Sequence, residues 1–275
     1  MRLKDIIVRK VMRKPLTIKK EMTVLDTIKV LLKDGVDVAV IDDEGESKVV
    51  TSYSVAEIIL KDFKTISKSL EKTVMFISKK VSYVPESKKL RKLMKNLEHL
   101  VHSGNLIFLG RGGKITGYLK PEDLFAVYNR NFMCNDINTN FFYPVNCLMI
   151  YPNRSIKSTL SSLIKNNSSF AFVYSRSGFK GVIGIRDILS EFVAEENIKK
   201  ILSGDLGYFY EASISEIEYS KDTCISVEEI SREKIISTIL KNGNIVILKD
   251  KSIYRAIDDK NLLYFTHKVL FMRSL

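Results

Sequence analysis

The spacing of apolar residues along residues 15–62 changes from extended to helical and back. Between Thr23 and Gly35 the apolar residues recur every three or four positions, which is the pattern of one buried helix face. Thr23 has the character of a helix N-cap, and Gly35 that of a helix stop. The segment therefore predicts one unit, in the order strand 15–18, helix 23–35, strand 36–41, strand 48–51 and helix 55–60.

The same order of elements returns three more times. The second copy predicts a helix over 90–100 and a hairpin turn over 110–113, and the fourth copy is the most eroded. From the first strand to the residue that opens the last helix, the copies have about equal lengths: Thr17 to Ser54, Ser82 to Asp123, Met149 to Asp187 and Ile225 to Asn261. An internal repeat of this kind predicts a mixed α/β (α+β) fold of four β-α-β-β-α units.

Each copy ends in a related segment that leads into its last helix. The four segments are Val-Val-Thr51-Ser-Tyr-Ser54-Val, Gly117-Tyr-Leu-Lys120-Pro-Glu-Asp123-Leu, Gly181-Val-Ile-Gly184-Ile-Arg-Asp187-Ile and Arg255-Ala-Ile-Asp258-Asp-Lys-Asn261-Leu. This pattern resembles the signature of the cystathionine-β-synthase (CBS) domain, and the opening Val11-Met-Arg-Lys-Pro15-Leu-Thr17-Ile is similar to the usual start of that domain. The resemblance covers nearly the whole chain and implies four CBS repeats that pack in two pairs.

A stretch rich in asparagine and aromatic residues, 127–146, separates the second copy from the third. We expect the boundary between two domains there, near residue 133. The first pair would then occupy 1–133, with repeats at about 8–62 and 72–128. The second pair would occupy 134–275, with repeats at about 137–193 and 214–271.

The resemblance also implies a ligand, because such proteins commonly hold adenine nucleotides between paired repeats. An acidic residue at the start of the last helix would accept hydrogen bonds from the ribose hydroxyls. The preceding hydroxyl residue and the helix N-terminus would receive phosphate. The base would lie in an apolar slot between the first and central strands. The expected protein is a non-catalytic regulator that binds an adenosine-containing nucleotide such as AMP, ADP or ATP and needs no cofactor.

The four repeats differ in how many residues of this ligand site they retain. Asp123 with Lys120, and Asp187 with Arg186, retain the acid and gain a nearby basic residue, while Gly184 has lost the hydroxyl. In repeat one, Thr51 keeps the hydroxyl but Ser54 replaces the acid. Repeat four has Asp258 and Asn261 in these places, and we expect it to be empty. Thr17, Ser82 and Tyr83, at the first strands, complete the candidate set of ligand-binding residues. Alternatively, Asp123 and Asp187 merely cap their helices.

The composition of the chain bears mainly on its binding partners and on its cellular compartment. The formal net charge of +12 leaves open a nucleic-acid-associated protein that uses the repeats as a scaffold, as well as a structural dimerisation module with decayed sites. No apolar run is long enough to span a membrane, and no secretory signal is visible, so we expect a cytoplasmic protein. We also expect the protein to form a homodimer and to act on an unknown protein effector.

Neither a metal site nor catalytic machinery is expected. The three cysteines are odd in number, widely spaced and without a C-x-x-C motif, so we expect buried fillers. His99 and His102 have the spacing of one helical face but lack a third metal ligand. No nucleophile and base can be assembled into a catalytic set, so an enzyme is the least favoured class.

Overall fold

The computed structural model of the chain describes residues 6–43, 45–61, 65–94, 97–132, 147–205 and 207–272. Repeat 1 comprises β1 (Leu16–Thr17), α1 (Val24–Lys33), β2 (Val38–Asp43), β3 (Glu46–Thr51) and α2 (Ser52–Lys61). Repeat 2 comprises β4 (Val84–Pro85), α4 (Leu90–Met94), β5 (Ile107–Arg111), β6 (Lys114–Leu119) and α5 (Pro121–Phe132). The order of elements is the one that the sequence predicts.

The second half of the chain repeats this order. Repeat 3 comprises β7 (Met149–Ile150), α6 (Ile156–Lys165), β8 (Phe170–Ser175), β9 (Gly178–Gly184) and α7 (Ile185–Phe192). Repeat 4 comprises β10 (Cys224–Ser226), α10 (Arg232–Asn242), β11 (Ile245–Lys249), β12 (Ser252–Ile257) and α11 (Asp259–Met272). Three helices lie in the connections that follow repeats 1 and 3: α3 (Ile66–Glu71), α8 (Glu195–Leu202) and α9 (Gly207–Glu211).

Each repeat forms its own three-stranded sheet. The first strand pairs in parallel with the second strand, and the second pairs antiparallel with the third. The parallel step needs a crossover, which the first helix of each repeat supplies, whereas the antiparallel step needs only a hairpin. Gly112 and Gly113 make the hairpin of repeat 2 with φ of 58° and 85°, a conformation that glycine adopts without strain. The predicted hairpin turn at 110–113 is confirmed.

The predicted ends of the first helix are also correct, but the predicted helix over 90–100 is too long. The Thr23 hydroxyl accepts a hydrogen bond from the backbone N–H of Asp26 at 3.0 Å, and Gly35 has φ of 66° just beyond α1. In repeat 2, α4 ends at Met94 and a separate 3-10 turn covers Leu97–His99. His102 lies in an isolated β-bridge to Leu106, so His99 and His102 do not share a helical face.

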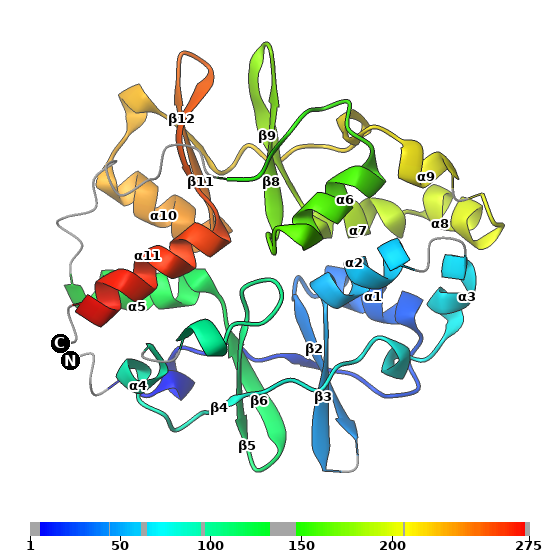
Figure 1. Cartoon of the computed structure of the whole chain (residues 1–275), viewed down its shortest axis with the longest axis horizontal. Helices are drawn as coiled ribbons and strands as arrows, with labels where there is room; N and C mark the ends of the chain where they lie inside the picture. The colour runs from blue at the N-terminus through cyan, green and yellow to red at the C-terminus, as the bar shows by residue number, and fades with distance from the viewer. Residues whose placement is uncertain are drawn as a thin grey trace.

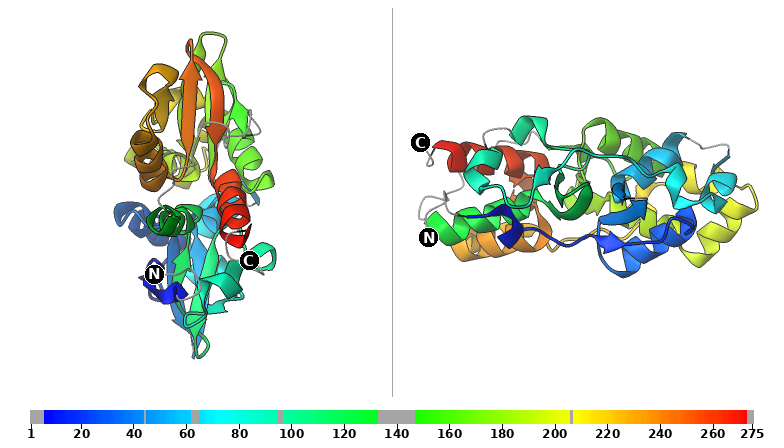
Figure 2. Two further views of the ribbon diagram at one scale, coloured as in Figure 1. Left: turned by 90° about the vertical axis from the view of Figure 1, so that its left-hand side faces the viewer. Right: turned by 90° about the horizontal axis from the view of Figure 1, so that it is seen from below.

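Two layers of apolar packing build the molecule from these repeats. The sheets of repeats 1 and 2 pack face to face through a cluster that includes Val40 and Phe108, and those of repeats 3 and 4 do so through Phe172 and Val246. The helices of repeat 1 then pack on those of repeat 3, and the helices of repeat 2 on those of repeat 4. Figure 1 shows these helices meeting across the middle, and Figure 2 shows that the assembly is flat. The result is a disc of two stacked pairs.

The segments that lead into the repeats cross over within each pair. The backbone of Arg13, ahead of repeat 1, bridges Tyr118 of repeat 2, and Lys79, ahead of repeat 2, bridges Val49 of repeat 1. Ser220, ahead of repeat 4, bridges Val182 of repeat 3 in the same way. Each of these three lead-in segments therefore lies against the last strand of the partner repeat, beside the residues that open its last helix.

The predicted domain boundary near residue 133 falls within 133–146, outside the described residues, as does Cys134. Cys147 is buried and Cys224 is partly buried. Over the described ranges, no helix combines the length and the apolar character that a membrane span requires.

Candidate functional site

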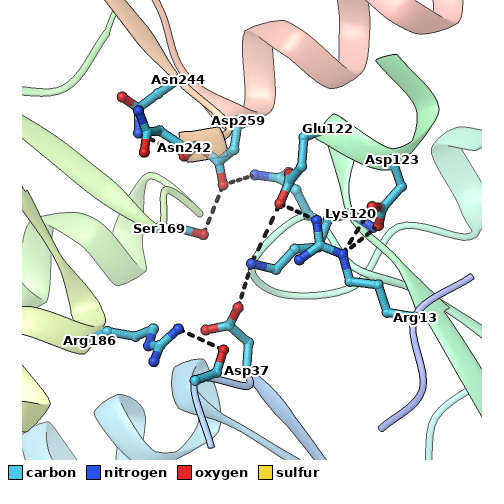
Figure 3. Close-up of polar contacts among 12 residues, drawn as sticks. Arg13, Asp37, Lys120, Glu122, Asp123, Ser169, Arg186, Asn242, Asn244 and Asp259 are labelled. Carbon is cyan, nitrogen blue, oxygen red and sulfur yellow. Dashed lines mark hydrogen bonds and ion pairs between the residues drawn. The ribbon is translucent and has the colours of Figure 1, made fainter. Parts of the chain in front are cut away.

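A cavity of about 570 Å³ lies at the centre of the disc, and all four repeats contribute to its wall. The wall includes the loops that precede the central strands and the first turns of the last helices. These parts of the four repeats meet because the helices of one pair pack on the helices of the other pair. Four basic residues line it, namely Arg13, Lys120, Arg186 and Lys241, and so do four acidic residues, namely Asp37, Glu122, Asp187 and Asp259. Figure 3 shows how closely several of these side chains face one another. A cavity with both charges suits a polar ligand that carries its own donors and anionic groups.

The repeat-3 side of this cavity holds three of the predicted site residues. The backbone N–H of Gly184 donates to the carboxylate of Asp187 at 2.7 Å, so Asp187 caps helix α7 and also lines the cavity. Burial raises the pKa of Asp187 above its ordinary value, although this hydrogen bond and the charge of Arg186 oppose the rise. The Arg186 guanidinium donates to the backbone carbonyl of Gly35 in repeat 1 at 2.9 Å. Neither Asp187 nor Arg186 belongs to an ion pair among the described residues.

Apolar and small residues complete this side of the cavity. Phe170 opens strand β8 and Val182 lies on β9, and both side chains are buried at the wall of the cavity. Ser220, from the lead-in segment of repeat 4, lies beside Val182 and also lines the wall. The cleft of repeat 3 thus has an apolar wall, a short hydroxyl side chain and an uncovered carboxylate.

The repeat-2 side is occupied by a chain of ion pairs. Lys120 forms ion pairs with Asp37 of repeat 1 and, at 3.6 Å, with Glu122. Arg13 reaches Glu122 and Asp123, with 2.9 Å between nitrogen and oxygen in each pair. Burial alone would raise the pKa of Asp37, but the charge and hydrogen bond of Lys120, together with the charges of Arg186 and Arg13, hold the pKa of Asp37 below its ordinary value. Asp123 therefore faces a guanidinium, whereas Lys120 lines the cavity.

The remaining candidates of repeats 1 and 2 divide between the cavity and the outside. Thr51 lines the cavity, and its hydroxyl accepts from the N–H of Ser54 at 3.0 Å while the Ser54 hydroxyl accepts from the N–H of Thr51. This exchange caps helix α2 and buries Ser54. Thr17 and Ser82 are exposed, and the phenol of Tyr83 accepts from the N–H of Gly113 at the hairpin. Hence Thr17, Ser82 and Tyr83 do not line the central cavity.

Repeat 4 contributes more polar groups than the sequence suggests. Asp258 caps helix α11 by accepting from the N–H of Asn261 at 2.7 Å. The next residue, Asp259, is only 4% exposed and accepts from Asn105 and Ser169, both at 2.9 Å. One oxygen each of Asp259, Asn244 and Thr223 is buried without a hydrogen-bond partner in the part of the chain that the structure describes. Burial, together with the charge of Asp258, raises the pKa of Asp259 to about 6.

Sequence reasoning missed Arg13, Asp37, Glu122 and Asp259 as residues of the cavity. Glu122 and Asp259 stand next to signature positions, so the sequence could have identified them as acidic residues in the first turn of a helix. Arg13 and Asp37 carry no such signal, because their role depends on contacts with repeats about 80 to 110 residues away in the chain. Across the described ranges, no group of three histidine, cysteine or acidic residues has the arrangement of a metal site.

The comparisons with known proteins agree with this architecture. Residues 8–67 match the family model of the CBS domain. Protein MJ1225 from Methanocaldococcus jannaschii has 12% identity and a TM-score of 0.79, with 94% of this chain and 99% of that chain covered. An uncharacterized conserved protein from Pyrococcus horikoshii has 17% identity and a TM-score of 0.53, with 96% and 99% covered. No curated protein matches at a significant level. Likeness at these identities concerns the fold: residues 8–67 match the CBS domain, and the chain shares with these structures a fold that here consists of four repeats in two pairs.

Proposed function

We propose that the protein is a non-catalytic regulator that binds an adenosine-containing nucleotide on the repeat-3 side of the central cavity. The observation that carries this proposal is the pair Asp187 and Arg186, adjacent at the start of α7, both lining the cavity and neither in an ion pair among the described residues. A carboxylate in this place accepts from two ribose hydroxyls, and a guanidinium binds phosphate with more than one hydrogen bond.

The surroundings of this pair suit the other parts of a nucleotide. Phe170 and Val182 offer an apolar surface to the base, and Ser220 leaves room beside it. The first turn of α7 favours negative charge through the helix dipole, as at any helix N-terminus. A nucleotide placed with its ribose at Asp187 would direct its phosphates toward Arg186 and the centre of the disc.

Binding at this place would connect to regulation through the packing of the repeats. Arg186 of repeat 3 donates to Gly35 of repeat 1, so a phosphate that draws the guanidinium away changes a contact between the two pairs. A ligand that prefers one orientation of the pairs shifts the population toward it. We propose that a protein effector reads this change, that the protein acts as a homodimer and that it does so in the cytoplasm.

A thermal-shift panel with AMP, ADP, ATP, S-adenosylmethionine and NAD tests the proposal. A ligand present at about 100 times its Kd should add about 2.7 kcal/mol of stability, and we expect such a rise for at least one compound. If no compound raises the Tm, the nucleotide proposal is wrong, and titration with duplex DNA and RNA at low salt becomes the next experiment.

Replacement of Arg186 by methionine tests the phosphate contact. We expect Arg186→Met to weaken binding of AMP roughly tenfold or more while leaving adenosine unaffected, because only the phosphate loses a charge-assisted hydrogen bond. Arg176→Met, in the exposed β8–β9 turn, is the matched control and should leave both affinities unchanged. Equal weakening of AMP and adenosine would show that Arg186 does not contact phosphate.

A further inference from the structure

The side chain of Arg13 lies against Asp123, the acid at the signature position of repeat 2. The backbone of Arg13 pairs with Tyr118, with N–H to oxygen distances of 2.8 and 3.0 Å, so the side chain is delivered to the start of α5. There its Nε lies 2.9 Å from both carboxylate oxygens of Asp123, and its Nη2 lies 2.9 Å from Oε1 of Glu122. The backbone N–H of Lys120 also donates to the carboxylate of Asp123 at 2.9 Å.

This arrangement leaves little room for a neutral ligand group. The Asp123 side chain is 16% exposed, and the guanidinium that covers it bears a full charge next to two carboxylates. Charge-assisted hydrogen bonds of this kind are roughly twice as strong as those from neutral donors such as ribose hydroxyls. A nucleotide therefore does not displace Arg13 from Asp123 by its ribose alone.

The cleft of repeat 3 provides an internal comparison. Ser220 bridges Val182 as Arg13 bridges Tyr118, and in both clefts the preceding residue packs on the signature glycine. A Cβ on Gly117 would clash with Met12, and a Cβ on Gly181 would clash with Tyr219. The two lead-in segments thus follow the same path.

The two clefts differ in the side chain that this path delivers. In repeat 3 it is the short hydroxyl of Ser220, and Asp187 has no cationic partner among the described ion pairs. In repeat 1 the corresponding residue is Lys79, whose ammonium pairs with Glu57 instead of reaching Ser54. Only Arg13, of these three residues, forms an ion pair with the carboxylate at the start of the last helix.

We infer that Arg13 is a built-in occupant that closes a latent nucleotide site in the repeat-2 cleft, and that it limits the protein to fewer bound nucleotides than its clefts allow. This inference rests on the proposed function, since it assigns to Asp123 the ribose contact proposed for Asp187. Removal of the guanidinium frees Asp123 for the ribose, and Lys120, which pairs with Asp37 and Glu122, lies at the same helix start.

Calorimetric titrations of the full chain with AMP, ADP and ATP, each in a separate experiment, test the inference. The variant Arg13→Ser copies the residue of the repeat-3 cleft, and we expect the number of bound nucleotides to rise from one per chain to two. The double variant Arg13→Ser with Asp123→Ala should return to one. Arg9→Ser, an exposed arginine in the same lead-in segment, is the matched control and should bind as wild type does.

Each outcome of the titrations decides between the two proposals. Two sites in the wild type, or one site in both wild type and Arg13→Ser, overturn the inference but leave the proposed function intact. A site in Arg13→Ser alone supports the inference and contradicts the proposed repeat-3 site. Absence of binding in both proteins overturns both proposals. Thermal unfolding shows whether Arg13→Ser is folded, and Arg13→Gln, which keeps the length but not the charge, replaces it if it is not.

Discussion

Replacement of Lys120 by methionine is expected to lower the free energy of unfolding by roughly 3 kcal/mol at neutral pH. The ammonium of Lys120 lies between Asp37 and Glu122, whose side chains are 19% and 11% exposed. Loss of one member of a buried ion pair costs several kcal/mol because the remaining charge keeps its desolvation penalty without its partner. Urea unfolding at pH 7.5 measures this difference.

Two further measurements distinguish an unpaired charge from simple loss of packing in Lys120→Met. They test how the loss of stability depends on Asp37 and on pH. The double variant Asp37→Asn with Lys120→Met should recover most of the stability, because no unpaired charge is left. The loss in Lys120→Met should also shrink as the pH falls through the acid range, since a protonated Asp37 no longer needs a cation. Lys114→Met is the control, because its pair with Asp42 is about half exposed on both sides. A Lys120→Met protein as stable as the control would contradict the account of the ion pairs.

Replacement of Asp259 by asparagine is expected to change how stability depends on pH. The pKa of Asp259 rises from 3.8 to about 6 in the folded protein, mainly through burial and then through the charge of Asp258. Because each tenfold change in proton affinity is worth about 1.4 kcal/mol, this rise corresponds to about 3 kcal/mol. Between about pH 4 and pH 6 the folded protein binds a proton that the unfolded chain has released, so the contribution of Asp259 to stability falls as the pH increases.

Asparagine cannot ionise, and it keeps an acceptor for Asn105 and Ser169. The free energy of unfolding of Asp259→Asn, relative to wild type, should therefore increase by about 3 kcal/mol between pH 4 and pH 7. Urea unfolding at a series of pH values measures the difference, with Asp205→Asn, an exposed carboxylate, as the control. A difference that stays constant over this range would show that Asp259 is ionised in the folded protein throughout.

The sequence predicted those parts of the fold that depend on local interactions. The cap at Thr23, the stop at Gly35 and the glycine hairpin at 110–113 each involve residues a few positions apart. The local sequence is therefore enough to predict these features. The helix over 90–100 was predicted too long because its apolar spacing continues past Met94, although Leu97–His99 forms a 3-10 turn.

The central cavity was only partly predictable for the opposite reason. Lys120, Arg186 and Asp187 were found because they occupy signature positions, and they do line the cavity. The contacts that distinguish one cleft from another come from other repeats, as with Arg13 at Asp123 and Gly35 at Arg186. From Asp258 and Asn261 at its signature positions, repeat 4 was expected to bind no ligand. Its contribution to the wall of the cavity comes from two other residues, Asp259 and Asn244.

The central claim, that the cleft of repeat 3 holds the nucleotide, is tested most directly by equilibrium dialysis of radiolabelled ATP against two matched variants. Asp187 and Asp123 stand at the same position in their repeats and each caps its helix through one backbone N–H. Replacing either by alanine removes that cap, and Asp123→Ala also removes the ion pair with Arg13. We predict that Asp187→Ala abolishes saturable binding while Asp123→Ala binds as wild type does. Retained binding in Asp187→Ala, or loss in Asp123→Ala alone, would contradict the claim.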